Sequence, residues 1–436
     1  MHDTHVLAPS IQTGLGIYYL ILVGLNVGYS AYQFLVPRNR SQAFIWGGVA
    51  LLFLIHAGAY LTGNGWIMPM PARDAVDRLM GAVSYFVISV ALFVLFLWFR
   101  KFLTEPLVAW TILNVSLLGS GWAMTDPSFR AIITKEDNVP IVMLIFFVGI
   151  FTWFAFRKAV LNDDRLAKGE APLEKLEDEK VLVWPDLVYT ELIAMIVVTF
   201  ILVVWSVLLK APLEQPASTA KAPNPSKAPW YFLGLQEMLV YYDPWMAGVV
   251  LPTMIIIGLI SLPYIDFNQK GNGYFTFIQR KFAVSTFLFG FVVLWTTLIV
   301  LGTFLRGPNW NFFGPFEKWD PHKVLPLTNY QLSDYFWLGL NNWFSLNKTF
   351  PEGQGIGGIL LRESPGILLV LAYLFLLPPL LAKTVLRSFF IKMGFIRFFL
   401  LVNLIQFMAA LPIKMILRWT INLKYIVYIP EWFFNI

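Results

Sequence analysis

Long apolar blocks separated by short polar connections form the dominant pattern along the chain. The blocks run for about 20 residues, which is the length that an α-helix needs to cross the hydrocarbon core of a bilayer. The segments predicted to span a membrane are 13–35, 43–61, 79–99, 106–124, 139–156, 187–209, 246–265, 282–304, 366–381 and 398–416. The pattern therefore predicts an all-α integral membrane protein, a polytopic helical bundle of about ten transmembrane helices.

Two polar stretches interrupt this pattern and suggest boundaries. Residues 162–183 are charged and helix-prone, and residues 307–361 carry many aromatic side chains between prolines and glycines. Because Trp and Tyr favour the lipid headgroup region, the second stretch is predicted to form amphipathic surface helices outside the cytoplasm. The resulting division is an N-terminal five-helix membrane region (1–161), a charged cytoplasmic linker (162–183), a central membrane domain (184–306), an extracytoplasmic aromatic loop (307–361) and C-terminal membrane helices (362–436).

Composition and charge agree with a membrane protein. Hydrophobic residues make up 58% of the 436 residues and charged residues 13%, and the mean hydropathy is +0.66. The net charge of +6 does not indicate nucleic-acid binding, because the basic residues gather at the ends of the apolar segments. The clusters that share one side are Arg38 and Arg40, Arg100 and Lys101, Arg157 and Lys158, Arg280 and Lys281, and Lys383 and Arg387. By the positive-inside rule that side is cytoplasmic, so both termini and residues 223–245 are predicted to face outward.

The chain contains no cysteine. Disulfides, covalently attached c-type haem, thiolate-held iron–sulfur clusters and cysteine nucleophiles are therefore excluded from this polypeptide.

The stretch 223–245 differs from the rest of the chain, because prolines and aromatic residues replace the apolar run. Its prolines disfavour a helix as far as Pro229. After Pro229, the spacing of Trp230, Leu233, Glu237 and Tyr241 predicts a short helix. That helix is expected at a membrane surface, carrying aromatic residues and one buried carboxylate.

This stretch also resembles a known family. The pair Trp230-Tyr231, followed by Phe232 and Gln236, is similar to the Pro-Glu-Trp-Tyr motif of cytochrome b, as found in the small split subunit IV of cytochrome bf complexes. Of the flanking segments, 184–187 resembles the start of the family's helix E, 251–263 resembles helix F and 282–304 resembles helix G, in the same order. The resemblance covers about 183–306, and it identifies the central membrane domain as similar to the C-terminal, non-haem half of cytochrome b.

The resemblance implies a quinol-oxidising pocket at the outer face. The implied pocket residues are Pro229, Trp230, Tyr231, Phe232 and Gln236. Tyr231 and Glu237 are the implied catalytic residues, because a pocket of this kind needs a hydrogen-bond partner for the quinol hydroxyl and a proton acceptor.

The chain departs from the motif at Ala228-Pro229, which stands where the family has Pro-Glu. The usual proton-accepting glutamate is therefore missing, and Glu237 is its nearest replacement. The alternative is that Glu237 only makes hydrogen bonds inside a helical bundle. Asp186 lies where the family approaches an inner-face quinone-reducing site, although it can also simply begin a helix.

The four histidines are His2, His5, His56 and His322. Only His56 lies within a predicted span, so the chain cannot supply the histidine pairs that hold two b-type haems, and no metal site is predicted. His56 is expected to form a hydrogen bond to a neighbouring helix, with single-haem ligation as the alternative. His2 and His5 are expected to be an ordinary terminal segment, with metal binding as the alternative.

The function implied by the resemblance is that of a membrane subunit of a bacterial quinol–cytochrome c oxidoreductase in the cell inner membrane. Quinol would be oxidised with release of protons, while b-type haems and a Rieske 2Fe-2S centre would be carried by partner chains. The expected partners are a haem-bearing cytochrome b subunit, a Rieske iron–sulfur protein and a c-type cytochrome, in a dimer of a multi-subunit complex. The chain alone is expected to be inactive.

A structural or docking anchor with a degenerate quinone site is the competing hypothesis, favoured by the missing motif glutamate. A transporter is disfavoured, because no span carries the paired charges or the Gly/Pro-broken repeats of a midplane substrate site. The C-terminal run Pro430-Glu431-Trp432 matches three of the four motif residues but lacks the flanking spans, and is interpreted as a chance match.

Overall fold

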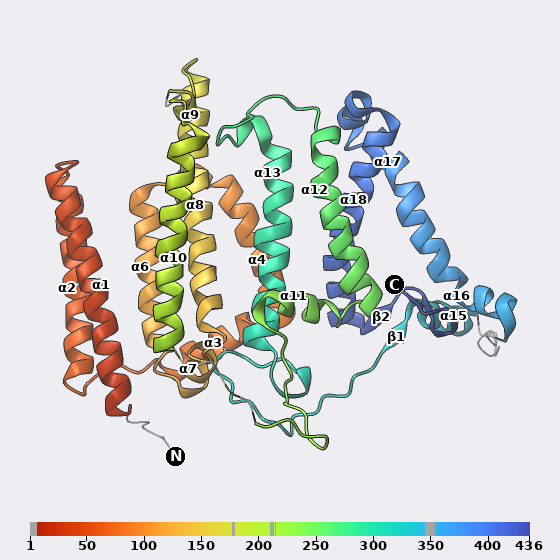
Figure 1. Ribbon diagram of the computed structural model, residues 1–436. Helices are drawn as coiled ribbons and strands as arrows, with labels where there is room; N and C mark the ends of the chain where they lie inside the picture. Colours follow the sequence, from red (N-terminus) through yellow and green to blue (C-terminus); the bar gives the residue numbers. More distant parts are fainter. Residues whose placement is uncertain (1–6, 177–178, 210–212, 214, 345–353) are drawn as a thin grey trace. The chain divides into compact units, whose positions relative to one another are not determined.

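The computed structural model describes residues 7–176, 179–209, 213, 215–344 and 354–436, so His2 and His5 lie outside the described residues. The α-helices (Figure 1) are α1 (Pro9–Leu35), α2 (Arg40–Leu61), α3 (Met70–Leu79), α4 (Ala82–Trp98), α5 (Arg100–Leu103), α6 (Pro106–Ala123), α7 (Pro127–Ile133), α8 (Val139–Ala167), α9 (Leu173–Leu176), α10 (Val188–Leu208), α11 (Trp230–Met238), α12 (Leu251–Ile265), α13 (Lys281–Leu288), α14 (Thr296–Val300), α15 (Leu332–Phe344), α16 (Gly355–Leu371), α17 (Leu377–Lys383) and α18 (Arg387–Ile421). The π-helical turns are η1 (Val183–Leu187), η2 (Met246–Val250), η4 (Phe289–Trp295), η5 (Leu301–Leu305) and η7 (Ala372–Leu376), and the 3₁₀ turns are η3 (Ile278–Arg280), η6 (Pro308–Trp310) and η8 (Pro430–Trp432).

The membrane-protein prediction is confirmed. Within the described ranges, nine helices are long and apolar enough to cross a membrane, and a tenth arises if α3 and α4, which meet at a 79° bend, count as one broken span. The predicted span 79–99 therefore begins later than expected, at Ala82, because Leu79 ends the separate helix α3. The only strands in this part of the chain are very short: β1 (Tyr330–Gln331), β2 (Leu423–Tyr425), β3 (Tyr428–Ile429) and β4 (Phe434–Asn435), with β1 parallel to β2 and β3 antiparallel to β4.

Helix α8 is longer than the sequence predicted. It continues through Ala167, past the expected end at residue 156 and into the polar stretch that begins at Asn162. The Asn162 side chain is fully buried, donates to the Phe275 carbonyl at 3.0 Å and accepts from the Leu173 backbone N–H at 2.9 Å. These bonds satisfy a polar side chain inside the fold, so polarity in the sequence does not mark the end of the helix there.

The polar stretch 307–361 also contains regular structure. It includes η6, β1 and α15, and α16 starts within it at Gly355, earlier than the predicted span at residue 366. Ser333 of α15 is fully buried and donates to Glu363 of α16 at 2.9 Å, so these two helices are joined by a buried polar contact.

The chain divides into two compact units, each built from segments far apart in the sequence. The first unit comprises 1–80, 105–135 and 313–319, and the second comprises 81–104, 136–312 and 320–436. In the first unit, α1 packs along α2 through a core that includes Tyr19, Phe53 and Tyr60. In the second unit, α4, α8 and α13 share a cluster around Phe156, and α12 packs on α18. Helix α10 of the second unit has no buried residue.

Candidate functional site

Helix α11 carries the residues that the sequence singled out. It starts at Trp230, directly after Pro229, whose missing N–H is harmless at a helix start, and ends at Met238. The prediction of a short helix after Pro229 is confirmed. Its buried residues are Leu233, Gly234, Glu237 and Met238.

The opposite face of α11 is open. Tyr231 is 55% exposed and Phe232 is 54% exposed. The Tyr231 ring lies edge-on to Trp230, with ring centroids 5.8 Å apart, and 4.8 Å from Phe232. The structure thus brings Trp230, Tyr231 and Phe232 together as one aromatic surface, which we call the aromatic face.

Glu237 lies away from the aromatic face, and its side chain is fully buried within a polar cluster. Its Oε1 accepts from Arg306 Nη2 at 2.7 Å and from the Tyr241 hydroxyl at 2.9 Å. Its Oε2 accepts from Arg306 Nε and from the Trp310 indole Nε1, each at 3.0 Å. Arg306 also donates to the Trp310 carbonyl at 2.7 Å and lies over the Phe312 ring, 3.7 Å from its centroid.

These contacts determine what the carboxylate can do in this geometry. The guanidinium neutralises its charge, and charge-assisted hydrogen bonds occupy both of its oxygens. Burial, together with the Glu237 carboxylate, raises the pKa of Tyr241 well above its usual range, so the tyrosine stays protonated and serves as a donor. The cluster therefore anchors α11 to the chain segment that follows η5.

Close packing holds α11 at the same place. A Cβ added to Gly302 of η5 would lie 3.1 Å from Leu233 Cγ and 3.6 Å from Glu237 Cβ. The small residue at 302 therefore allows α11 to approach η5 closely.

Gln236 fixes the loop that precedes α11. Its Oε1 accepts from the Ala228 backbone N–H and its Nε2 donates to the Ser226 carbonyl, both at 2.8 Å. Lys227 in the same loop donates to the Thr303 carbonyl at 2.8 Å. Gln236 thus holds the loop against the start of α11, so its amide groups are already engaged within the chain.

The structure separates the two residues predicted to be catalytic. Tyr231 and Glu237 lie on different faces of α11, one exposed and one fully buried. Sequence analysis missed Arg306 and Trp310 as partners of Glu237. Tyr241 could have been found, because it lies four residues after Glu237, a spacing at which helical side chains meet.

Asp186 lies in η1 and is exposed, and its backbone carbonyl accepts from the Thr190 hydroxyl at 2.9 Å. An acidic side chain in the first turn of a helix is favourable beside the N-terminal end of the dipole. Pro430, Glu431 and Trp432 form η8 between β3 and β4, far along the chain from α11.

His56 belongs to the first unit and lies among aromatic rings. It is 4% exposed, and its Nδ1 lies 2.9 Å from the Leu52 carbonyl, while Nε2 has no hydrogen-bond partner among the described atoms. Tyr19 and Trp66 flank it, with ring centroids 5.1 and 4.5 Å away. In the part of the chain that the structure describes, no group of three or more His, Cys, Asp and Glu side chains could hold a metal ion.

A family comparison identifies the segment that contains this site. Residues 216–314 match the family model described as Cytochrome b(C-terminal)/b6/petD. These residues are similar to the C-terminal part of cytochrome b, and we call them the cytochrome b C-terminal segment. The match includes α11, Glu237 and Arg306, and confirms the resemblance for residues 216–306, whereas the segment 184–187 lies outside it. No solved structure matches the chain.

The cytochrome b C-terminal segment covers under a quarter of the 436 residues, and membrane-spanning helices flank it on both sides. The chain is therefore a multi-pass membrane protein, and the family indicates a membrane component of an oxidoreductase complex of the quinol–cytochrome c or b6f type.

Proposed function

We propose that the chain is the non-haem membrane subunit of a bacterial quinol–cytochrome c oxidoreductase and supplies the outer-face quinol-oxidation pocket. The observation that carries the proposal is the aromatic face of α11, which lies within the cytochrome b C-terminal segment and is open to a ligand. Its rings provide flat apolar walls for a quinol head, and the Tyr231 hydroxyl provides a hydrogen-bond partner. Pro229 and Gln236 position this surface by starting α11 and holding the loop before it.

Electrons would pass to haems and an iron–sulfur centre on partner chains: a haem-bearing cytochrome b subunit, a Rieske protein and a c-type cytochrome. Quinol is the substrate that this chain would contact. An inner-membrane location with outward termini, a dimeric complex and a role for Asp186 at an inner-face quinone site belong to the same proposal.

The test is quinol oxidation by the purified complex carrying Tyr231→Phe. Loss of one hydrogen bond to the reacting hydroxyl is expected to lower kcat/KM about tenfold. Tyr264→Phe is the matched control, because Tyr264 is an exposed tyrosine on α12, away from the aromatic face. Equal rates in both variants and in the wild type would refute the proposed pocket.

Glu237 as the proton acceptor stays a prediction. In the described geometry its carboxylate oxygens accept hydrogen bonds from Arg306, Tyr241 and Trp310, so some of these bonds must break before Glu237 can accept a proton from a quinol. Glu237→Gln distinguishes the two roles. A proton acceptor gives a slower rate and an altered pH–rate profile in an intact complex, whereas an anchoring role gives a less stable complex with an unchanged profile.

The second candidate function is a docking subunit with a degenerate quinone site. The sealed position of Glu237 favours it, because no other carboxylate of α11 is available to the aromatic face. A complex that oxidises quinol at the wild-type rate after Tyr231→Phe would support this function.

A further inference from the structure

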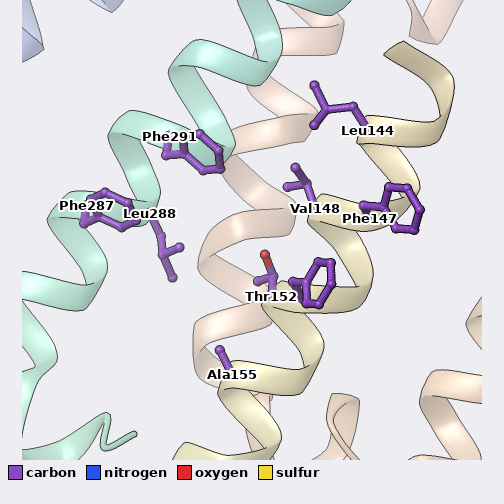
Figure 2. Close-up of a pocket in the computed structure, with 9 residues that line it drawn as sticks. Leu144, Phe147, Val148, Thr152, Ala155, Phe287, Leu288 and Phe291 are labelled. Atoms are coloured by element: carbon purple, nitrogen blue, oxygen red, sulfur yellow. The ribbon is translucent and has the colours of Figure 1, made fainter. Parts of the chain in front are cut away.

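An apolar hollow lies between α8 and the α13–η4 segment of the second unit (Figure 2). Its volume is about 600 Å³, within the ~300–1,000 Å³ typical of small-molecule sites. Thr152 contributes the one polar side chain of its lining. Figure 2 shows Val148 and Thr152 of α8 facing Leu288 of α13 across this space. We call it the α8–α13 groove.

Helix α4 packs against both helical segments that form the walls of the groove. Phe96 of α4 packs edge-on against Phe156 of α8, with ring centroids 4.9 Å apart, and Phe93 lies 6.2 Å from Phe289 of η4. One helix therefore contacts both walls and keeps them apart. An apolar groove that is open at the surface of membrane-spanning helices suits a hydrocarbon chain.

A row of stacked aromatic rings, which we call the aromatic ladder, extends from the groove along its α13–η4 wall. The rings of Phe287 and Phe291 stack at 5.9 Å and 11°, and those of Phe291 and Trp295 at 5.1 Å and 10°. Four residues slightly exceed one turn of an α-helix and fall short of one turn of a π-helix. The change from α13 to the π-helical η4 therefore keeps every fourth side chain on one face.

The ladder ends beside α11. The indole Nε1 of Trp295 lies 4.0 Å from the position of a Cβ built on Gly234. Trp230 and Tyr231 precede Gly234 by four and three residues, so they are its neighbours on the surface of the helix. The row of stacked rings therefore runs from the groove to the buried Gly234 of α11, the helix whose first turn carries the aromatic face.

We propose that the α8–α13 groove binds the isoprenoid tail of the quinol whose head lies at the aromatic face of α11. This inference rests on the proposed function, and it adds a substrate-tail site built partly from α8, which lies outside the segment 216–314. Lipid chains are as apolar as the groove, so the selectivity comes from close packing against rigid rings rather than from the hydrophobic effect. A quinol tail is favoured over a phospholipid acyl chain because the row of rings from the groove ends against α11, whose first turn carries the aromatic face.

The test compares a long-tail isoprenoid quinol with decylquinol in the purified complex. Val148→Trp fills the groove, and Ile150→Trp is its matched control, because Ile150 lies on the same helix, is 41% exposed and does not line the groove. The ratio of KM for the long-tail quinol to KM for decylquinol is expected to rise about fivefold in Val148→Trp, as packing contacts along the tail are lost. It is expected to keep its wild-type value in Ile150→Trp.

An unchanged ratio in Val148→Trp, or an equal change in both variants, overturns the inference. A second measurement uses the wild-type complex and a quinone with a photoreactive diazirine on its tail. Label on peptides from α8 or the α13–η4 segment is expected, and label elsewhere overturns the inference. Displacement of the label by phosphatidylglycerol, but not by unlabelled long-tail quinone, overturns it in favour of a lipid site.

Failure of the proposed function gives a different result. In that case the complex carrying Tyr231→Phe oxidises quinol at the wild-type rate, whereas the photolabelling result still reports whether the groove binds the tail.

Discussion

Removing Arg306 is the perturbation that tests the buried cluster most directly. Arg306→Met keeps an unbranched apolar side chain of similar length but leaves the Glu237 carboxylate without its counter-charge. The side chains of Arg306 and Glu237 are 7% and 0% exposed, so solvent cannot replace the lost partner.

The expected cost follows from the contacts. Breaking one side of a buried ion pair costs ~3–5 kcal/mol, mainly because the remaining charge stays buried. Arg306 also loses its bond to the Trp310 carbonyl and its contact with the Phe312 ring, and a cation–π contact adds ~0.5–2 kcal/mol. We therefore expect Arg306→Met to lower the free energy of unfolding by about 4–6 kcal/mol.

The assay is SDS-driven unfolding of the purified protein in mixed micelles, followed by tryptophan fluorescence. The double variant Glu237→Gln/Arg306→Met removes both charges and is expected to recover ~2 kcal/mol or more of the loss. Lys101→Met is the control, because the Lys101–Asp164 pair is 61% and 47% exposed and such pairs contribute only ~0–1 kcal/mol.

A cost below ~1 kcal/mol for Arg306→Met would refute the reasoning, since it would mean that Glu237 does not depend on Arg306 for its charge compensation. A double variant no more stable than Arg306→Met would also refute it, because the loss would then not come from an unpaired carboxylate.

Three further predictions concern other contacts. Gly302→Val is expected to displace α11 from η5 and to lower the melting temperature of the protein. Gly248→Val on η2 is the control, since a Cβ at 248 meets nothing within 4 Å, and equal melting temperatures of the two variants would contradict the packing argument. Asn162→Leu removes buried bonds to the Phe275 carbonyl and the Leu173 N–H and is expected to cost ~1–3 kcal/mol, measured by the same unfolding assay, while no loss would mean that water replaces the amide. Burial and the Arg418 guanidinium lower the pKa of Lys424 to about 8, against the opposing effect of Asp243, from the ordinary value of 10.5. Between about pH 8 and 10.5 the folded state has released a proton that the unfolded state retains, so the stability of the wild type is expected to rise with pH over this window. The rise is expected to be smaller in Lys424→Arg, and equal pH profiles would contradict the assignment of this effect to Lys424.

The spans and α11 could be predicted because their signals are local. An apolar block of sufficient length and a proline at a helix start depend on neighbouring residues only. The C-terminal end of α8 could not be predicted in this way, because Asn162 is satisfied by Phe275, which lies 113 residues away.

The role of Glu237 was beyond the sequence for the same reason. Its partner Arg306 lies 69 residues further along the chain, and Trp310 was predicted only as an aromatic residue at the membrane interface. In the structure the Trp310 indole donates to Glu237, so a specific hydrogen bond accompanies whatever interfacial preference the ring has. The residues that form the aromatic face were found from the sequence because they are adjacent in it.

The backbone at Pro229 bears on whether the chain can accept the motif glutamate at this position. Position 229 is exposed and has φ −52° and ψ 149°, a conformation open to any L-residue. The hydrogen bonds of the Gln236 side chain involve only backbone groups of Ser226 and Ala228, so they do not depend on the side chain at 229. A glutamate at 229 would sit at the start of α11, where the helix dipole stabilises a negative charge. The backbone conformation at 229 therefore permits a glutamate there after a single substitution. Pro229→Glu would supply the motif carboxylate at the start of α11, next to the aromatic face.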